Sequence, residues 1–235
     1  MNSSIKIILL DIEGTTTPID FVYQVLFPYA RNHAQDFLAR HWNEVQSEIT
    51  QLKSEHAADE RQGLNPPALD SSQPESVAAY IYWLIDQDRK STPLKSLQGK
   101  IWEEGYKNEV LKSLLFSDVP TAFKRWQHQR ICIFSSGSVL AQKLLFTYTE
   151  FGDLSKFISG WFDTKIGNKR EAASYLRIAN ALQTQADEIL FVSDVTAELE
   201  AARVAGMQTR LSIRPGNSLQ PNAQNFQSIN TFDEL

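Results

Sequence analysis

Cysteine is almost absent from this sequence: Cys132 is the only one among 235 residues. A single cysteine excludes an internal disulfide, so the fold must be held by its apolar core. The apolar run RICIFSS around Cys132 predicts a buried thiol, and a reducing compartment suits such a thiol. We therefore expect a cytoplasmic protein.

Long apolar runs and strong charge are missing as well. The start, MNSSIKIILLD, has one lysine and too short an apolar run for a signal peptide, and no run is long enough to span a bilayer. The chain has 23 basic and 28 acidic residues, a net charge of -5, and no basic run. We therefore expect no membrane and no nucleic acid among its partners.

The composition that remains is that of an ordinary globular protein, with 42% hydrophobic residues. A chain of this length suits one large domain or a domain with a sizeable insertion. The apolar run from Ile5 to Leu10 predicts a buried strand that ends at Asp11. From Asp118 onward, strand patterns alternate with amphipathic helices, and TRLSI is the last strand. This alternation predicts an α/β protein with a parallel sheet covered on both faces.

The stretch between Phe21 and Leu115 has helical periodicity and no pattern of a parallel strand. At about a hundred residues it has the size of a small domain. Ser72, followed by Glu75 three residues later, predicts a capping box for one of its helices. Its aromatic residues form either a core or the lining of a substrate pocket, and the pattern leaves both open.

Asp11 and Glu13 lie where the first strand breaks into a loop. Ligands bind at the carboxyl ends of parallel strands, so this is the position of a site. Side chains two residues apart on an extended backbone point the same way, so the two carboxylates could share a magnesium ion. If one attacks phosphorus, the enzyme is a phosphotransferase with an aspartyl-phosphate intermediate. The alternative is that both are ordinary loop acids.

Ser135 and Ser136 follow the strand pattern ICIF and precede a helix, an arrangement that binds phosphate or merely caps the helix. Lys169 lies where the next helix begins, and a cation there opposes the helix dipole unless an anion is near. A solvated surface lysine is the alternative, and the spacing does not distinguish Lys169 from Arg170 as the cation.

Asp194 ends the strand pattern ILFVS, with Glu198 four residues further on. It is predicted to complete a magnesium site, to cap the following helix, or both. Together, these strand-end residues would supply a nucleophile, an acid or base, an anion-binding hydroxyl, a cation and metal ligands. That combination is typical of phosphoryl transfer by positioning and charge neutralisation.

The motifs DIEGT, SSG, a lysine and SD resemble the four-motif pattern of the haloacid dehalogenase superfamily. More closely, the chain is similar to the enolase-phosphatases of methionine salvage, and the similarity covers most of its length. The blocks that carry it are DIEGTTTPIDFV, LFPYAR, DRKSTPLKSLQGKIW, FSSGSVLAQKLLF, GWFDTKIGNK, DVTAELEAA and RPGN.

The resemblance implies a Rossmann-like core formed by residues 1–17 and 116–235, with a helical cap domain at 18–115 inserted after the first strand. It implies that Asp11 forms the aspartyl-phosphate and that Glu13 protonates the leaving oxygen and activates water. One Mg²⁺ per subunit is expected on Asp11, Glu13 and Asp194. We expect the protein to be a monomer.

The remaining site residues take their roles from the same resemblance. Ser135 and Ser136 would hold the phosphate, and Lys169 would neutralise Asp11 and the phosphoryl oxygens. Glu198 matches in spacing only and is left as a group behind the site.

The implied substrate is a phosphorylated diketone, 2,3-diketo-5-methylthiopentyl-1-phosphate, which is enolised and dephosphorylated to the acireductone. A phosphatase of the same superfamily that acts on another small phosphate ester is the first alternative. A dehalogenase is disfavoured because its chemistry needs no metal or second acid. The second alternative is a non-catalytic phosphate-binding or scaffolding protein on the same fold.

Overall fold

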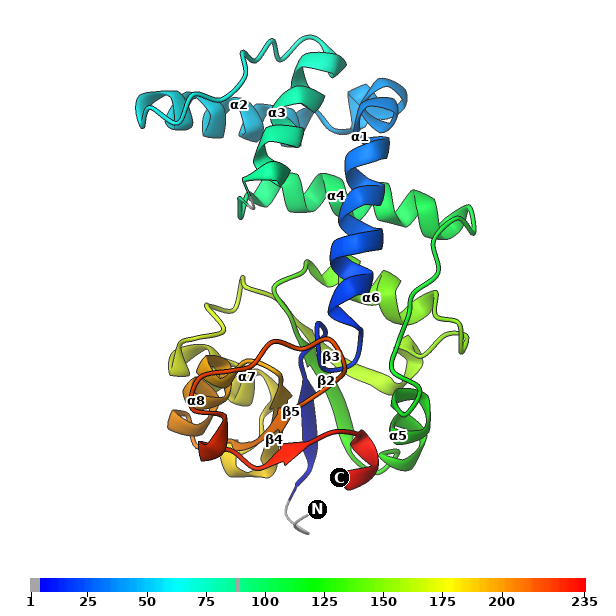
Figure 1. Ribbon diagram of the computed structural model, residues 1–235, viewed down its shortest axis with the longest axis vertical. Coiled ribbons are helices and arrows are strands. Elements are labelled where there is room, and N and C mark those ends of the chain that lie inside the picture. The colour runs from blue at the N-terminus through cyan, green and yellow to red at the C-terminus, as the bar shows by residue number, and fades with distance from the viewer. Residues whose placement is uncertain (1–4, 88) are drawn as a thin grey trace. The chain divides into compact units, whose positions relative to one another are not determined.

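The computed structural model describes residues 5–87 and 89–235. These residues form two compact units, Met1–Val22 with Lys112–Leu235 and Tyr23–Leu111. The first unit contains the sheet and the second contains helices (Figure 1).

The sheet of the first unit is parallel throughout. Within the described residues its six strands follow the order β3-β2-β1-β4-β5-β6, so β1 lies at the centre (Figure 1). The strands are β1 (Ile7–Leu10), β2 (Arg130–Phe134), β3 (Ile158–Phe162), β4 (Ile189–Ser193), β5 (Gln208–Ser212) and β6 (Ser228–Ile229). The predicted α/β fold is confirmed, but TRLSI is not the last strand. The two-residue β6 is too short to produce a periodic pattern, and it exists because it pairs with β5.

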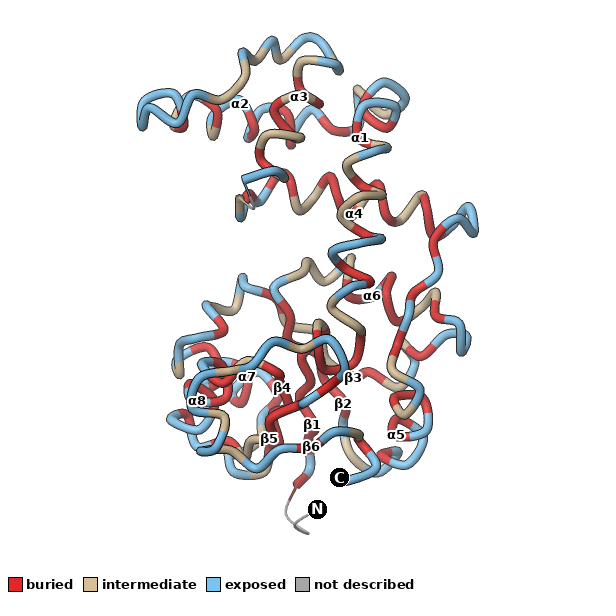
Figure 2. The backbone as a smooth tube through the Cα atoms, in the orientation of Figure 1, coloured by how far each residue is buried: buried red, intermediate tan, exposed pale blue. Residues whose placement is uncertain are grey.

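Helices cover both faces of this sheet. Ile8 and Leu10 of β1 pack in one buried cluster with residues of α5 (Val119–Arg125) and α6 (Val139–Thr147). Ile7 and Leu9 pack in the other cluster, with α7 (Ala172–Leu182) and α8 (Thr196–Val204). Successive residues of β1 therefore point to opposite faces, and all four are buried, as the red tube of Figure 2 shows.

The second unit is built from four helices in its described residues: α1 (Phe27–His41), α2 (Gln46–Arg61), α3 (Pro74–Asp86) and α4 (Thr92–Lys107). α1 packs against α3 and α4, and α2 packs against α4. A π-helical segment, Phe21–Leu26, precedes α1. Of the aromatic residues, Tyr80 and Trp102 are buried and Tyr23 is exposed.

The predicted capping box at Ser72 and Glu75 is wrong. Helix α3 begins at Pro74. The residue at the N-cap position is therefore Gln73, and its side chain makes no capping hydrogen bond. The Ser72 hydroxyl instead donates to Asp70 at 2.6 Å. Proline fixes the backbone for the first helical turn and removes one N–H that a cap would satisfy.

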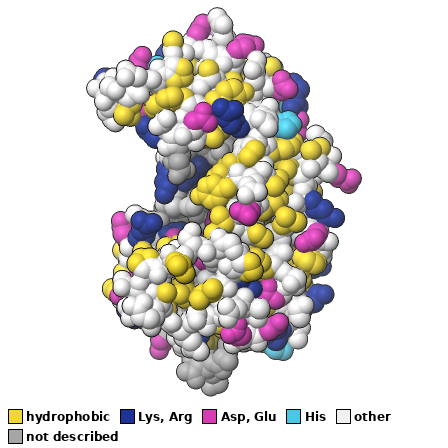
Figure 3. All heavy atoms as spheres, viewed as in Figure 1, with side chains coloured by type: hydrophobic (Ala, Val, Ile, Leu, Met, Phe, Trp, Pro, Cys, Tyr) yellow, Lys and Arg dark blue, Asp and Glu magenta, His cyan; other side chains and the backbone are white. Residues whose placement is uncertain are grey.

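Two further findings concern the hydropathy of the helices and the side chains on one face of the molecule. In the part of the chain that the structure describes, no helix is both long and apolar enough to span a bilayer. On the face drawn in Figure 3, basic side chains are interspersed with acidic and apolar ones.

Candidate active site

Asp11 directly follows the central strand at its carboxyl end. Leu10 is in register with Ile133 of β2 and Val192 of β4, and the Asp11 N–H donates to the Val192 carbonyl at 3.0 Å. Its side chain is buried, and Oδ1 accepts a hydrogen bond from the Ile12 N–H at 2.8 Å. The register of the three strands therefore fixes this carboxylate at the edge where ligands bind in such sheets.

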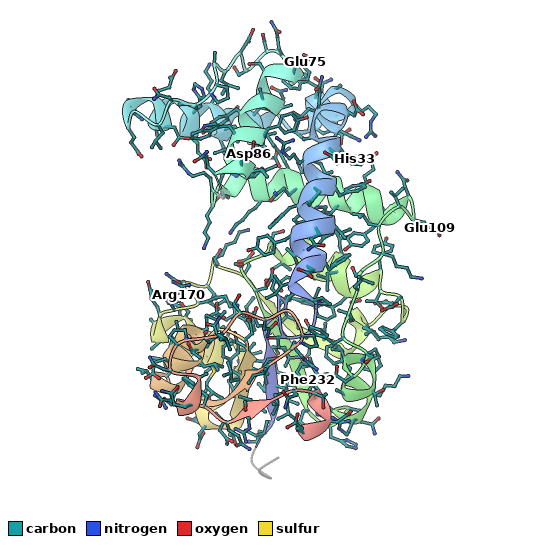
Figure 4. The ribbon with its side chains drawn as sticks, in the orientation of Figure 1. His33, Glu75, Asp86, Glu109, Arg170 and Phe232 are labelled. Carbon is teal, nitrogen blue, oxygen red and sulfur yellow. The ribbon has the colours of Figure 1, made fainter. Side chains whose placement is uncertain are left out.

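Lys169 is the cation that meets Asp11. Its Nζ lies 2.7 Å from Asp11 Oδ1 and 2.7 Å from Glu198 Oε2. Burial alone would lower the pKa of Lys169, but the two carboxylates outweigh it and raise that pKa, so the amine stays charged. The neighbouring Arg170 is exposed (Figure 4), which answers the choice that spacing left open.

Two side chains of α7 hold the loop that carries Lys169, by donating hydrogen bonds to its main-chain carbonyls. Tyr175, buried in the first turns of α7, donates its hydroxyl to the Lys169 carbonyl at 2.7 Å. Ser174 donates to the Asn168 carbonyl, also at 2.7 Å. These bonds set the position from which the lysine side chain reaches the end of β1.

Sequence reasoning missed Ser193, the last residue of β4, and left Glu198 without a role. The Ser193 hydroxyl lies 3.0 Å from Asp11 Oδ2 and 3.2 Å from Glu198 Oε2, so it donates to one of them at a time. Burial and the nearby Asp11 raise the pKa of Glu198 to about 8. The four-residue spacing of Asp194 and Glu198 was the available signal for the second residue, since one helical turn brings Glu198 back to the strand end.

Asp194 lies just beyond β4. It does not cap α8, because the cap residue is Val195 and no side chain accepts there. Its carboxyl group instead packs against Gly14: a Cβ on Gly14 would lie 2.5 Å from Asp194 Oδ2. Burial and the charge of Asp11 raise the pKa of Asp194 to about 7. The end of β4 therefore places the Asp194 carboxylate beside the loop after β1, where it is affected by the charge of Asp11.

Glu13 faces Ser135, at the end of β2. The Ser135 hydroxyl donates to Glu13 Oε2 at 3.4 Å and accepts from the Gly137 N–H at 3.1 Å. Burial, and then the negative charge of Asp11, raise the pKa of Glu13. The raised pKa favours the protonated form of Glu13 more than in a free glutamate, and a general acid must hold a proton before it donates one.

The segment after β2 is tied down from α6. Gln142 donates to the carbonyls of Gly137 and Phe162 at 2.9 and 2.8 Å. Ser138 caps α6 by accepting from the Ala141 N–H. Ser136 is exposed, whereas Ser135 is buried beside Glu13. The two serines therefore differ in their exposure to solvent, although both lie in the segment between β2 and α6.

The donor set suits a hard cation such as magnesium. Two carboxylates, those of Asp11 and Glu198, contact the ammonium group of Lys169. Burial and repulsion by the charge of Asp11 raise the pKa values of three acids, Glu13, Asp194 and Glu198. An added cation would relieve this repulsion. No three Asp, Glu, His or Cys side chains among the described residues converge to hold a metal unaided. A magnesium ion, which takes oxygen ligands, would therefore complete its shell with main-chain, phosphate or water oxygens.

The end of β5 and the RPGN turn that follows it donate hydrogen bonds to the loop after β1. Ser212 Oγ and Asn217 Nδ2 both donate to the Gly14 carbonyl, at 3.1 and 2.9 Å. Arg214 Nε donates to the Thr15 carbonyl at 3.3 Å. Sequence reasoning gave these residues no role, because nothing in the spacing shows that β5 returns to the loop after β1.

The chain is similar to known proteins over most of its length. The family model of haloacid dehalogenase-like hydrolases matches residues 5–206. Enolase-phosphatase E1 of Synechococcus elongatus is 55% identical, covering 99% of this chain and 98% of that protein. Enolase-phosphatase E1 of Drosophila erecta is 43% identical over 98% of this chain and 92% of the relative. The solved UTR4 protein of Saccharomyces cerevisiae is 35% identical, with a TM-score of 0.81 over 98% of this chain and 100% of that one.

Proposed function

The chain belongs to the enolase-phosphatase E1 family of the haloacid dehalogenase-like hydrolases, and from this premise we propose that Asp11 is its phosphate-accepting nucleophile. The enzyme converts 2,3-diketo-5-methylthiopentyl-1-phosphate to the acireductone 1,2-dihydroxy-3-keto-5-methylthiopentene and phosphate, in methionine salvage. The observation that carries the role of Asp11 is its buried ion pair with Lys169, which holds the carboxylate at the end of the central strand.

In the phosphatase half, an Asp11 oxygen attacks phosphorus and the bond from phosphorus to the substrate oxygen breaks. Glu13, whose raised pKa suits a proton donor, gives its proton to that departing oxygen. Water then attacks phosphorus in the aspartyl-phosphate, and Glu13 takes a proton from this water. The bond between phosphorus and the Asp11 oxygen breaks, which releases phosphate and restores the Asp11 carboxylate.

The phosphoryl oxygens are held by charge and hydrogen bonds. Lys169 neutralises negative charge on Asp11 and on the phosphoryl group as it transfers. Ser135 and Ser136, in the segment between β2 and α6, supply hydroxyl and main-chain donors. Glu198 holds Lys169 by an ion pair, and the Ser193 hydroxyl holds Asp11 by a hydrogen bond.

Mg²⁺, one per subunit, is the cofactor we propose. The residues that would hold it are Asp11, Glu13 and Asp194, and position 13 would offer its main-chain oxygen because its side chain is turned to Ser135. When bound, magnesium supplies positive charge that stabilises the phosphoryl group and the enolate of the diketone.

The unit Tyr23–Leu111 is, in this proposal, the cap that selects the diketone. A cytoplasmic location and a monomeric state remain predictions. The cap assignment separates this enzyme from a phosphatase for simple sugar phosphates, because the same core chemistry serves both.

The test follows enediol absorbance and released phosphate as separate signals from the diketo phosphate. With magnesium, the wild-type protein should give both, and chelation should stop both. Asp11→Asn should stay folded and release no phosphate, whereas Asp20→Asn, the same change at an exposed position, should match the wild type. Phosphate from other esters only would favour a general phosphatase. No turnover of any ester would favour a phosphate-binding protein.

A further inference from the structure

Ser193, the last residue of β4, has one hydroxyl proton and two carboxylates within reach. Its Oγ lies 3.0 Å from Asp11 Oδ2 and 3.2 Å from Glu198 Oε2. The Val195 N–H donates to the same Oγ at 3.1 Å, which occupies a lone pair and leaves the O–H free to point at a carboxylate. Because Ser193 is fully buried, this proton goes to one of the two carboxylates.

The two carboxylates depend on this proton to different degrees. Asp11 Oδ1 accepts from the Ile12 N–H at 2.8 Å and lies 2.7 Å from Lys169 Nζ, but within the described part of the chain Oδ2 accepts from Ser193 alone. Glu198 Oε2 lies 2.7 Å from the same ammonium group, so it is an acceptor with a donor of its own. The direction of the Ser193 O–H therefore matters most to Asp11 Oδ2.

The state of Asp11 decides which oxygen is the better acceptor. A charged carboxylate accepts a stronger hydrogen bond than a neutral group, and Oδ2 is also the nearer oxygen, so the free carboxylate takes the proton. Whichever oxygen of Asp11 bonds to phosphorus, the carboxylate loses its negative charge, and Oδ2 becomes a weaker acceptor. The O–H then turns to Glu198 by rotation about the Cβ–Oγ bond, which moves no heavy atom.

We propose that Ser193 is a positioning residue that donates its hydrogen bond to Asp11 while Asp11 is a carboxylate, and to Glu198 while Asp11 is an aspartyl-phosphate. This role rests on the proposed function of Asp11 as the nucleophile. When water attacks phosphorus, the bond to the Asp11 oxygen breaks and its electron pair returns to the carboxylate. The Ser193 O–H turns back to Oδ2 as that charge develops, and the serine keeps its proton.

A hydrogen bond that favours the carboxylate over the phosphorylated form should speed the breakdown of the aspartyl-phosphate more than its formation. Ser193→Ala should therefore slow the decay of the aspartyl-phosphate about tenfold. The value of kcat/KM, which reports the steps up to its formation, should stay within about threefold of wild type. At saturating diketo phosphate and magnesium, a larger fraction of the variant than of the wild type should carry phosphate on Asp11.

Acid quenching followed by mass spectrometry of the intact protein measures this fraction, and a single-turnover time course gives the decay rate. Ser193→Cys is a second variant that fills the same space with a much weaker donor, and it should show the same slow decay. Ser193→Thr keeps the hydroxyl and should restore the decay rate. The matched control is Ser159→Ala in β3, which removes a hydroxyl that donates to the Ile131 carbonyl at 3.1 Å. Its decay rate should equal that of the wild type.

A structural role alone would lower kcat/KM and Tm without adding covalent phosphate, and that outcome in Ser193→Ala or Ser193→Cys would overturn the inference. Decay at the wild-type rate in both variants would overturn it as well. A wild-type protein that never carries covalent phosphate during turnover, together with an active Asp11→Asn variant, would instead refute the proposed nucleophile and the role of Ser193 with it.

Discussion

The ammonium nitrogen of Lys169 lies 2.7 Å from Oδ1 of Asp11, and both side chains are less than a tenth exposed. An ion pair this deep is screened little by water, so each partner depends on the other. The carboxylate holds the amine in the site, and the amine lowers the cost of bringing a phosphate dianion to a negatively charged nucleophile.

Lys169→Met should therefore lower kcat for phosphate release by about 100-fold or more, because no other cation of the loop reaches Asp11. The measurement is steady-state phosphate release under saturating magnesium. Arg170→Met is the control: its side chain is exposed one residue away, and kcat should be unchanged. A similar loss in both variants would assign the effect to the loop rather than to the ion pair.

Gly14→Ala should damage the site beyond its cost to the backbone. Gly14 has φ +67, a conformation that costs an L residue about 1–2 kcal/mol, and the new Cβ would lie 2.5 Å from Asp194 Oδ2. Phosphatase activity should therefore fall together with Tm. Gly63→Ala separates the two effects, since Gly63 has φ +72 and nothing within 4 Å of its Cβ position. This control should lose stability only, and an activity loss there would contradict the steric argument.

Arg214 should prove essential for stability. Its guanidinium group donates to Asp118 at 2.9 Å and to the Asn230 carbonyl at 2.8 Å, and it lies between the rings of Phe116 and Phe232. Arg214→Met leaves the largely buried Asp118 carboxylate without a cation and with the Phe232 N–H as its remaining donor, so the free energy of unfolding should fall by about 3 kcal/mol.

Urea unfolding measures this effect, and Arg214→Lys extends it. Lysine keeps the charge but lacks the planar group that makes three hydrogen bonds, so it should recover only part of the loss. Arg210→Met, whose guanidinium donates to the Thr209 carbonyl, serves as the control and should change little. Full recovery by lysine would mean that charge alone matters.

Glu48 should make the helical unit sensitive to acid. Burial opposes its charge, but hydrogen bonds from Lys100 and Ser96, both at 2.7 Å, hold the pKa of Glu48 below its usual value. A lowered pKa in the folded state gives stability that is complete above the ordinary glutamate pKa and is lost as pH falls through the folded value. Glu48→Gln should thus destabilise the protein by about 1 kcal/mol at pH 7 and by less near pH 3.

Unfolding curves of the wild type and the variant at the two pH values check this sign. Glu109→Gln is the companion measurement, since Glu109 is exposed in the same unit (Figure 4) and should show no such pH dependence. A difference between wild type and Glu48→Gln that grows on acidification would contradict the assignment.

Much of the site follows from local patterns. An apolar run that stops at a carboxylate marks both a buried strand and its carboxyl end, so Asp11 and Asp194 were predictable before any tertiary contact was known. The alternation of strands with helices then implies a parallel sheet, and a parallel sheet gathers those ends on one edge. Lys169 was predictable as a candidate for the same reason, because it opens a helix of that alternation.

What local pattern does not contain is the order of the strands. The placement of β1 between β2 and β4 brings Ser193 to Asp11 and Glu198 to Lys169, and the return of β5 brings Ser212 and Asn217 to Gly14. The choice of Lys169 over Arg170 also depends on which side chain the folded loop turns inward. Hydrophobic periodicity is a local property, so it already identifies the residues at strand ends. Which of these residues meet depends on strand order and register, because hydrogen bonds and ion pairs between distant segments form only in the folded chain.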